Sequence, residues 1–140
     1  MKKLLFTFLA LLFINLNSSS AQNFNSPMPF HNQTTCPVEV CLYVDVTGCG
    51  IPYSIMVCAT ILPGAYVNIA YPTGLPSLGC TYTVSQVSLG VPGHAPGVVN
   101  YFSRAQLETG ENFNAPLVPC TTSGGTVDFQ WSPGGYWNIW

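Results

Sequence analysis

The sequence predicts an all-β protein: an antiparallel two-sheet sandwich of about seven strands, stabilised by disulfides, with at most one short helix. Three observations support this fold class. Apolar residues alternate with polar ones in several segments, which is typical of half-buried strands. The 13 glycines and 12 prolines fall largely between these segments, where turns are needed. The six cysteines form an even set that can pair into up to three disulfides.

The first 21 residues have the pattern of a cleaved signal peptide. Lys2 and Lys3 form a charged start, an apolar run covers residues 4–16, and small polar residues lead to Ala21, after which cleavage is expected. The apolar run of about 13 residues is too short for a membrane span. Because the pattern resembles bacterial export signals, we predict a secreted protein in the periplasm, at the cell surface or in the extracellular space.

The remaining chain divides into an N-terminal arm over residues 22–35 and a single sandwich domain over residues 36–140. The arm is rich in Asn, Pro and Ser, and is predicted to be extended or to form a loosely docked strand. From residue 22 onward the chain has one arginine, Arg104, and five acidic residues, which give it a formal charge of −4. Nucleic acid is not an expected partner because no basic patch could neutralise its phosphates. No membrane-spanning segment is predicted either.

Residues 38–62 predict a β-hairpin around a turn at residues 47–52. Apolar side chains share one face of the two strands: Val38, Val40, Leu42, Val44 and Val46 on the first, and Tyr53, Ile55, Val57, Ala59 and Ile61 on the second. Folding the segment about this turn places Val46 opposite Tyr53 and Cys41 opposite Cys58. Directly opposed Cβ atoms are close enough for a cross-strand disulfide. We therefore predict a Cys41–Cys58 bond, worth roughly 3 kcal/mol in the chain-entropy model.

The pairing of the other four cysteines stays open. Cys36 and Cys49 lie at opposite ends of the first hairpin strand, too far apart to bond with each other. Each is then expected to bond with Cys80 or Cys120. The pairing Cys36–Cys80 with Cys49–Cys120 is slightly favoured over the exchange of partners. Zinc is the weaker interpretation because the cysteines lack the clustered C-x2-C spacing, and no metal or other cofactor is predicted.

The rest of the chain predicts five further strands and one helical turn. The strands are expected over residues 65–71, 80–89, 98–102, 126–131 and 136–140. A shift in apolar parity near Ser85 predicts a β-bulge. Ser103 and Gln106 have the spacing of a capping box before a short helix over residues 104–109, and a long loop over residues 111–125 carries Cys120. The last strand is apolar on both faces, so it must be central in a sheet or covered by a neighbour.

The chain offers few groups for catalysis. His31 lies in the arm and His94 in a loop rich in glycine and proline, and neither accompanies a recognisable nucleophile motif. Glu108 and Glu111 are interpreted as solvated carboxylates rather than as a calcium site. No catalytic residue is predicted, and the protein is expected not to be an enzyme.

Aromatic residues near the C-terminus are the remaining candidate site. Tyr136, Trp137 and Trp140, together with Tyr43 and Tyr66, could form a platform that stacks on sugar rings or docks a protein. The competing interpretation is that the tryptophans pack in the core. Two functional hypotheses follow. The first is a secreted, non-catalytic surface, adhesive or assembly component whose partner is a protein, including another copy of itself. The second is a carbohydrate-binding module that uses the aromatic platform.

Overall fold

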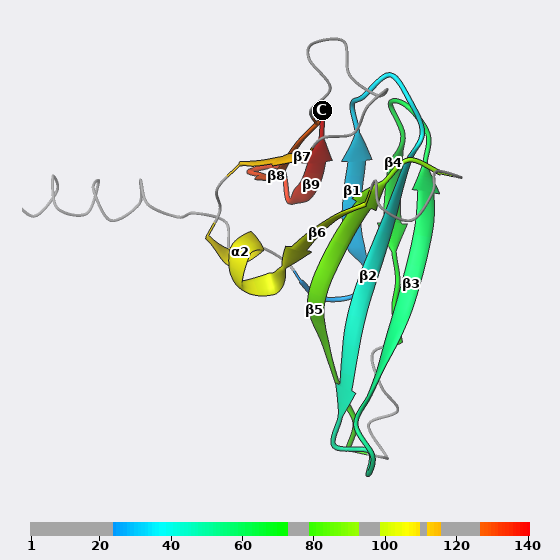
Figure 1. Ribbon diagram of the computed structural model, residues 1–140, viewed down its shortest axis with the longest axis vertical. Helices are drawn as coiled ribbons and strands as arrows, with labels where there is room; N and C mark the ends of the chain where they lie inside the picture. Colours follow the sequence, from blue (N-terminus) through cyan, green and yellow to red (C-terminus); the bar gives the residue numbers. More distant parts are fainter. Residues whose placement is uncertain (1–23, 73–78, 93–98, 110–111, 116–126) are drawn as a thin grey trace, which may run out of the picture.

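The computed structural model describes residues 24–72, 79–92, 99–109, 112–115 and 127–140 (Figure 1). These residues form two β-sheets with strand orders β3-β2-β5-β6 and β4-β1-β9-β8-β7. Buried side chains from both sheets make one shared core. The described part contains nine strands and one short helix, so the predicted sandwich-like, disulfide-stabilised β fold is confirmed. The predicted signal peptide over residues 1–21 lies outside the described residues.

The four-stranded sheet is built on a hairpin of β2 (Val38–Thr47) and β3 (Tyr53–Ile61). Its register is the predicted one, with Val46 opposite Tyr53 and Cys41 opposite Cys58. The apolar side chains of β2 that alternate toward the other sheet are almost completely buried. A shift of one residue would turn this whole apolar face to solvent, which is why the alternation specified the register so well.

The strands β5 (Thr81–Gly90) and β6 (Asn100–Ser103) complete this sheet. Tyr43 lies opposite Gln86 and Val44 lies opposite Val84, so Ser85 is an extra residue on β5. The Oγ of Ser85 donates a hydrogen bond to the carbonyl oxygen of Tyr43 at 3.2 Å. The predicted bulge is therefore confirmed, and it explains how residues of opposite parity on β5 can both enter the core.

The five-stranded sheet contains β4 (Tyr66–Ile69), β1 (Met28–Asn32), β9 (Tyr136–Ile139), β8 (Val127–Ser132) and β7 (Phe113–Ala115). β1 pairs antiparallel with β4 and parallel with β9, so it is an interior strand. The segment is extended, as predicted, but it is not loosely docked, because Met28, Phe30 and Asn32 are fully buried on one face of β1. The expected loop over residues 111–125 is also wrong in part, since it includes β7.

Aromatic rings fill much of the interior behind the five-stranded sheet. The Trp137 ring lies 4.9 Å from that of Phe129 and 5.6 Å from that of Phe24, measured between ring centroids. Trp137 and Ile139 are both buried on the inner face of β9. β9 lies between β1 and β8, so the central position foreseen for a strand with two apolar faces is the correct alternative.

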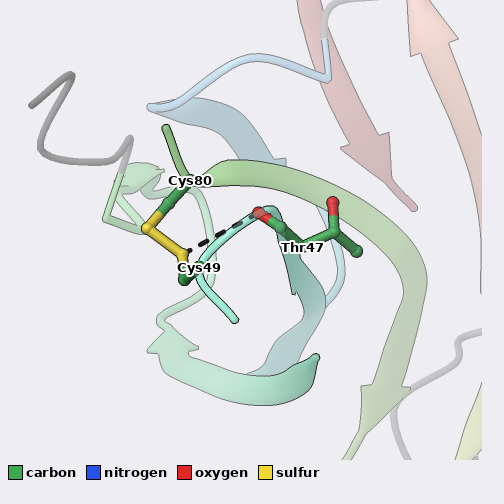
Figure 2. The surroundings of a disulfide bond; sticks show 3 residues. All are labelled: Thr47, Cys49 and Cys80. Carbon is green, nitrogen blue, oxygen red and sulfur yellow. Dashed lines mark hydrogen bonds between the residues drawn. A yellow bond between two sulfur atoms is a disulfide. The ribbon is translucent and has the colours of Figure 1, made fainter. Parts of the chain in front are cut away.

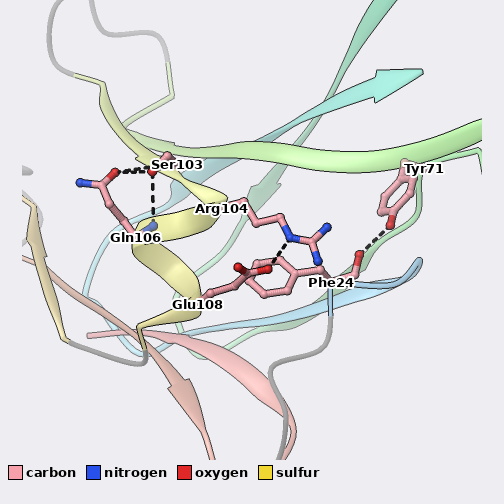
Figure 3. A network of polar contacts seen from close by, with 6 residues as sticks. All are labelled: Phe24, Tyr71, Ser103, Arg104, Gln106 and Glu108. Carbon is pink, nitrogen blue, oxygen red and sulfur yellow. Dashed lines mark hydrogen bonds and ion pairs between the residues drawn. The ribbon is translucent and has the colours of Figure 1, made fainter. Parts of the chain in front are cut away.

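The helix α2 (Arg104–Glu108) connects the edge strand β6 of one sheet to the edge strand β7 of the other. It begins with the predicted capping box (Figure 3). The Gln106 N–H donates to the Ser103 Oγ at 3.3 Å, and the Ser103 N–H donates to the Gln106 Oε1 at 2.9 Å. Leu107 is fully buried, so the helix covers this side of the sandwich with an apolar side chain.

The residues before β1 are joined to the body of the protein near α2. The Arg104 guanidinium lies 5.0 Å from the centroid of the Phe24 ring (Figure 3). The Tyr71 hydroxyl donates to the Phe24 carbonyl oxygen at 2.6 Å. Burial raises the pKa of Tyr71 above its ordinary value, and the charge of Arg104 opposes that shift. Phe24 is therefore part of the core rather than of a separate arm.

Two disulfides are defined by the described residues. Cys41 and Cys58 are bonded across the hairpin with a Cα–Cα distance of 4.0 Å, as predicted. Cys49 is bonded to Cys80 with a Cα–Cα distance of 4.9 Å (Figure 2), so the favoured pairing of Cys49 with Cys120, and of Cys36 with Cys80, is wrong. Cys36 is disulfide-bonded as well, and Cys120 lies outside the described residues. The disulfides indicate an oxidising, extracellular compartment.

The antiparallel pairing of β2 with β5 explains the correction. Thr47 at the end of β2 lies opposite Thr81 at the start of β5, which brings the next residues of each strand together. Gly48 has a φ of +82°, and a Cβ at this position would lie 2.5 Å from the Gly79 carbonyl oxygen. Close approach of the two backbones therefore requires glycine here and sets Cys80 beside Cys49.

Candidate functional site

The predicted C-terminal platform is not a single surface. Trp137 is only 1% exposed and packs in the core, whereas Tyr136 and Trp140 have the opposite parity along the chain. Tyr136 is half-buried, and Trp140 is 38% exposed. Trp137 therefore fits the interpretation that the tryptophans pack in the core. Tyr136 and Trp140 instead lie on the outward face of the sheet.

The structure brings Tyr136 together with Tyr66 and adds a residue that the sequence reasoning missed. The rings of Tyr66 and His31, which face each other across β4 and β1, are nearly parallel at a centroid distance of 3.7 Å. The Tyr136 ring stands edge-on to Tyr66 at 5.3 Å. His31 could have been found from the alternation of β1, in which Pro29 and His31 point away from the buried residues.

Polar contacts hold this cluster of three rings. The Nε2 of Gln33 lies 3.1 Å from the Nδ1 of His31, and a hydrogen bond joins the phenols of Tyr66 and Tyr136. That hydrogen bond raises the pKa of Tyr66 above its ordinary value. The rings are thus oriented by side chains of the same sheet face before any ligand arrives.

Tyr43 lies on the outward face of the other sheet. Its ring is 6.0 Å from that of Tyr101 and tilted by 56°. A hydrogen bond between the two phenols raises the pKa of Tyr101 above its ordinary value. Met56, opposite Tyr43 in the hairpin, is 60% exposed, and the Ser54 Oγ donates to the Asp45 carboxylate at 2.7 Å. Tyr43 and Tyr66 therefore lie on different sheets, and the rings of Tyr43 and Tyr101 are not coplanar.

A third surface runs where the two sheets end side by side at β3 and β4, which contact each other (Figure 1). We call it the apolar seam, and it consists of half-buried residues that pack at the margin of the core: Ile55, Val57, Ala59, Ala65 and Val67. Their inward-facing neighbours on β2 are almost completely buried. α2 covers the opposite side of the sandwich, between β6 and β7, with the buried side chain of Leu107.

The titratable candidates do not assemble into a catalytic constellation within the described residues. His94 and Glu111 lie outside them. The carboxylate of Glu108 forms an ion pair at 2.5 Å with the Nε of Arg104, one helical turn earlier (Figure 3). In the part of the chain that the structure describes, no three His, Cys, Asp or Glu side chains are grouped as metal ligands would be.

No family model, no curated protein and no solved structure matches this chain. Within the described ranges, no helix is long and apolar enough to cross a membrane. The surfaces described above are therefore the basis for assigning a function.

Proposed function

We propose that this chain is a secreted, non-catalytic assembly component that pairs with a second copy of itself along β3. The observation that carries the proposal is an edge strand of nine residues with no charged residue and no proline, next to the half-buried apolar seam. Natural edge strands are usually protected by charges, prolines or bulges, because unpaired backbone groups attract further strands. β3 has none of these protections.

The geometry of the Cys41–Cys58 disulfide shows which backbone N–H and C=O groups of β3 point away from β2. Cys41 and Cys58 face each other with a Cα–Cα distance of 4.0 Å, which is typical of a non-hydrogen-bonded antiparallel pair. The N–H and C=O of Cys58 therefore point away from β2. By alternation, those of Ser54, Met56 and Thr60 do so too. β3 thus offers a regular row of donors and acceptors to an added strand.

A two-fold axis at Val57 gives a self-complementary register. Met56 would pair with Cys58 of the second copy, and Ser54 with Thr60, through residues whose backbone groups face outward. Val57 would contact Val57 of the second copy, next to the seam residues Ile55 and Ala59. The two four-stranded sheets would then become one continuous sheet, and the seam of each copy would be covered.

The charges of the chain are compatible with this partner. Two copies repel each other through their net negative charge, but no charged residue lies on β3 or in the seam. Contact along β3 therefore brings no like charges together directly. An apolar interface centre without charges is also what distinguishes homodimer interfaces from the rest of a protein surface.

Replacing Met56 with lysine is expected to weaken self-association by about tenfold to a hundredfold. The two-fold axis would bring the two lysines close together in the dimer, whereas in the monomer the side chain extends into solvent from the edge. Sedimentation velocity of the oxidised protein over a range of concentrations measures the effect. Wild-type protein should show a reversible rise in mass with concentration.

The matched control is Gln86→Lys. Gln86 and Met56 flank the same residue, Tyr43, on the same outward face, but Gln86 belongs to the interior strand β5. The control should associate like wild type. Wild-type protein that stays monomeric at every concentration, or an equal loss in both variants, would overturn the proposal.

A further inference from the structure

The outward face of the five-stranded sheet carries a regular array of aromatic and amide side chains. We call it the polar-aromatic face, and its principal residues are Tyr66, His31, Tyr136, Asn138, Gln130 and Trp140. In one row across the strands, Tyr66 of β4 lies opposite His31 of β1, which lies opposite Asn138 of β9, which lies opposite Gln130 of β8. Adjacent strands place these side chains about 5 Å apart.

A second row lies about 7 Å farther along the strands. Two backbone hydrogen bonds, at 2.8 and 3.1 Å, join Asp128 to Trp140, so these residues lie opposite each other. Gln33 follows His31 by two residues and has the same parity. Trp140 is 38% exposed and Tyr66 is 62% exposed, so each row contributes one accessible ring.

The chemistry of this face matches that of a sugar. A pyranose ring has an apolar C–H surface that can stack on an aromatic ring and hydroxyl groups that both donate and accept hydrogen bonds. Tyrosine and tryptophan suit a surface that is apolar and hydrogen-bonding at once, and amides supply a donor and an acceptor in one group. Here three amides, on Gln33, Asn138 and Gln130, lie among the rings.

The charges on the polar-aromatic face favour an uncharged glycan over an anionic one. Arg104, the single Lys or Arg residue after residue 21, lies on α2 and pairs with Glu108, so the polar-aromatic face carries neither lysine nor arginine. Asp128 is its one carboxylate in the rows described above. Phosphates, sulfates and uronic acids would meet negative charge without compensation. A protein partner would favour an interface with an apolar centre, whereas the centre of this face is polar.

The side-chain amide of Asn138 independently supports a binding site on this face. Its Oδ1 is buried and has no hydrogen-bond partner among the described residues, although the residue lies in the middle of the face. The large majority of buried polar atoms in folded proteins have a partner. The Asn138 amide thus retains hydrogen-bonding capacity that the fold does not use.

We propose that the polar-aromatic face binds a neutral polysaccharide. Trp140 and the ring face of Tyr66 that His31 does not cover stack on sugar rings, and the amides of Asn138 and Gln130 bind hydroxyl groups. His31 and Tyr136 orient Tyr66 through the stacked and edge-on contacts described above, which lowers the entropy cost of binding. Tyr66 lies on the outward face of β4, opposite the face of the seam residue Val67, so the site does not depend on the proposed self-association.

Affinity gel electrophoresis and titration calorimetry of the oxidised protein test this proposal. The probes are a mixed-linkage β-glucan, a galactomannan and dextran as neutral polysaccharides, with polygalacturonate as the anionic comparison. At least one neutral polysaccharide should bind. Tyr66→Ala and Trp140→Ala should each weaken that binding at least tenfold, and Trp140→Phe should retain most of it.

The matched control for Tyr66→Ala is Tyr101→Ala, which removes a somewhat less exposed tyrosine, at 53% against 62%, from the outward face of the other sheet. It should bind like wild type, and so should Met56→Lys, which separates this proposal from self-association. The proposal is overturned if none of the neutral probes binds, if polygalacturonate binds in their place, or if Tyr101→Ala weakens binding as much as Trp140→Ala. Thermal unfolding of each variant confirms that the comparison is made between folded proteins.

Discussion

Replacing Asn32 with alanine is expected to lower the free energy of unfolding by about 3–5 kcal/mol. Asn32 is fully buried at the end of β1. Its Nδ2 donates to the carbonyl oxygens of Cys36 and Ile61, both at 2.8 Å. Its Oδ1 accepts from the Thr34 N–H at 2.9 Å. Alanine would remove all three hydrogen bonds, although the Cys36 carbonyl oxygen would keep the one that it accepts from the Thr34 Oγ1 at 2.9 Å. A backbone group left without a partner costs about 1–3 kcal/mol when buried.

The position of Asn32 explains why the loss should be large. Its own N–H donates to the Ala65 carbonyl oxygen at 3.1 Å, and its carbonyl oxygen accepts from the Gly64 N–H at 2.7 Å. The residue thus joins β1, the start of β2 and the turn between β3 and β4, which belong to both sheets. Chemical denaturation of the oxidised protein measures the change. A loss below about 1 kcal/mol would contradict this account.

Asn32→Asp separates the donor from the acceptor role. Aspartate can still accept from Thr34, but its ionised form cannot donate to the two carbonyl oxygens. Burial and those oxygens should raise the pKa of the new carboxyl above its ordinary value of about 3.9. A raised pKa in the folded state favours folding below the unfolded value and loses that contribution as pH rises. The variant should therefore approach wild-type stability near pH 3 and fall behind it toward pH 7.

The hairpin of β2 and β3 could be predicted in full because its information is local. The period-2 pattern is long, every apolar residue on one strand meets an apolar residue on the other, and Cys41 and Cys58 confirm the same register. The bulge at Ser85 and the capping box of α2 are local in the same sense. In each case the side chains that determine the structure lie within a few residues of it.

The cysteine pairing needed information that is not local. Cys36 and Cys49 lie beyond opposite ends of β2, as predicted, but this placement alone leaves Cys80 free to reach either end. The antiparallel placement of β5 beside β2 decides the choice, since it puts the start of β5 next to the end of β2. The residue pattern of one segment contains no information about which distant strand it pairs with.

β1 and the aromatic residues show the same limit at the candidate site. The pattern of β1 is short and includes a proline and a buried Asn, which is a weak signal for an interior strand. Parity correctly separates Trp137 from Trp140, but it does not tell which face is the core. The cluster of His31, Tyr66 and Tyr136 depends on three strands meeting in one sheet, so its membership could not be read from the C-terminal segment alone.

Trp137→Ala is expected to destabilise the protein by about 3–5 kcal/mol. The Trp137 ring contacts Phe129, Phe24 and Trp131, the last at a centroid distance of 5.2 Å, so its removal leaves a cavity lined by rings that cannot easily collapse. Trp140→Ala is the matched control. It removes the same side chain from the outward face of the same chain segment, and it should cost less than about 1 kcal/mol.

The pair of variants also separates stability from binding. Trp137→Ala should reduce polysaccharide binding only in proportion to the fraction that unfolds, whereas Trp140→Ala should reduce it at full stability. Trp137→Phe adds a finer test, because the Trp137 Nε1 is buried without a hydrogen-bond partner among the described residues. Phenylalanine removes that unsatisfied donor while keeping an aromatic ring, so it should recover most of the stability lost with alanine. Equal losses for Trp137→Phe and Trp137→Ala would mean that the donor is satisfied and contributes to stability.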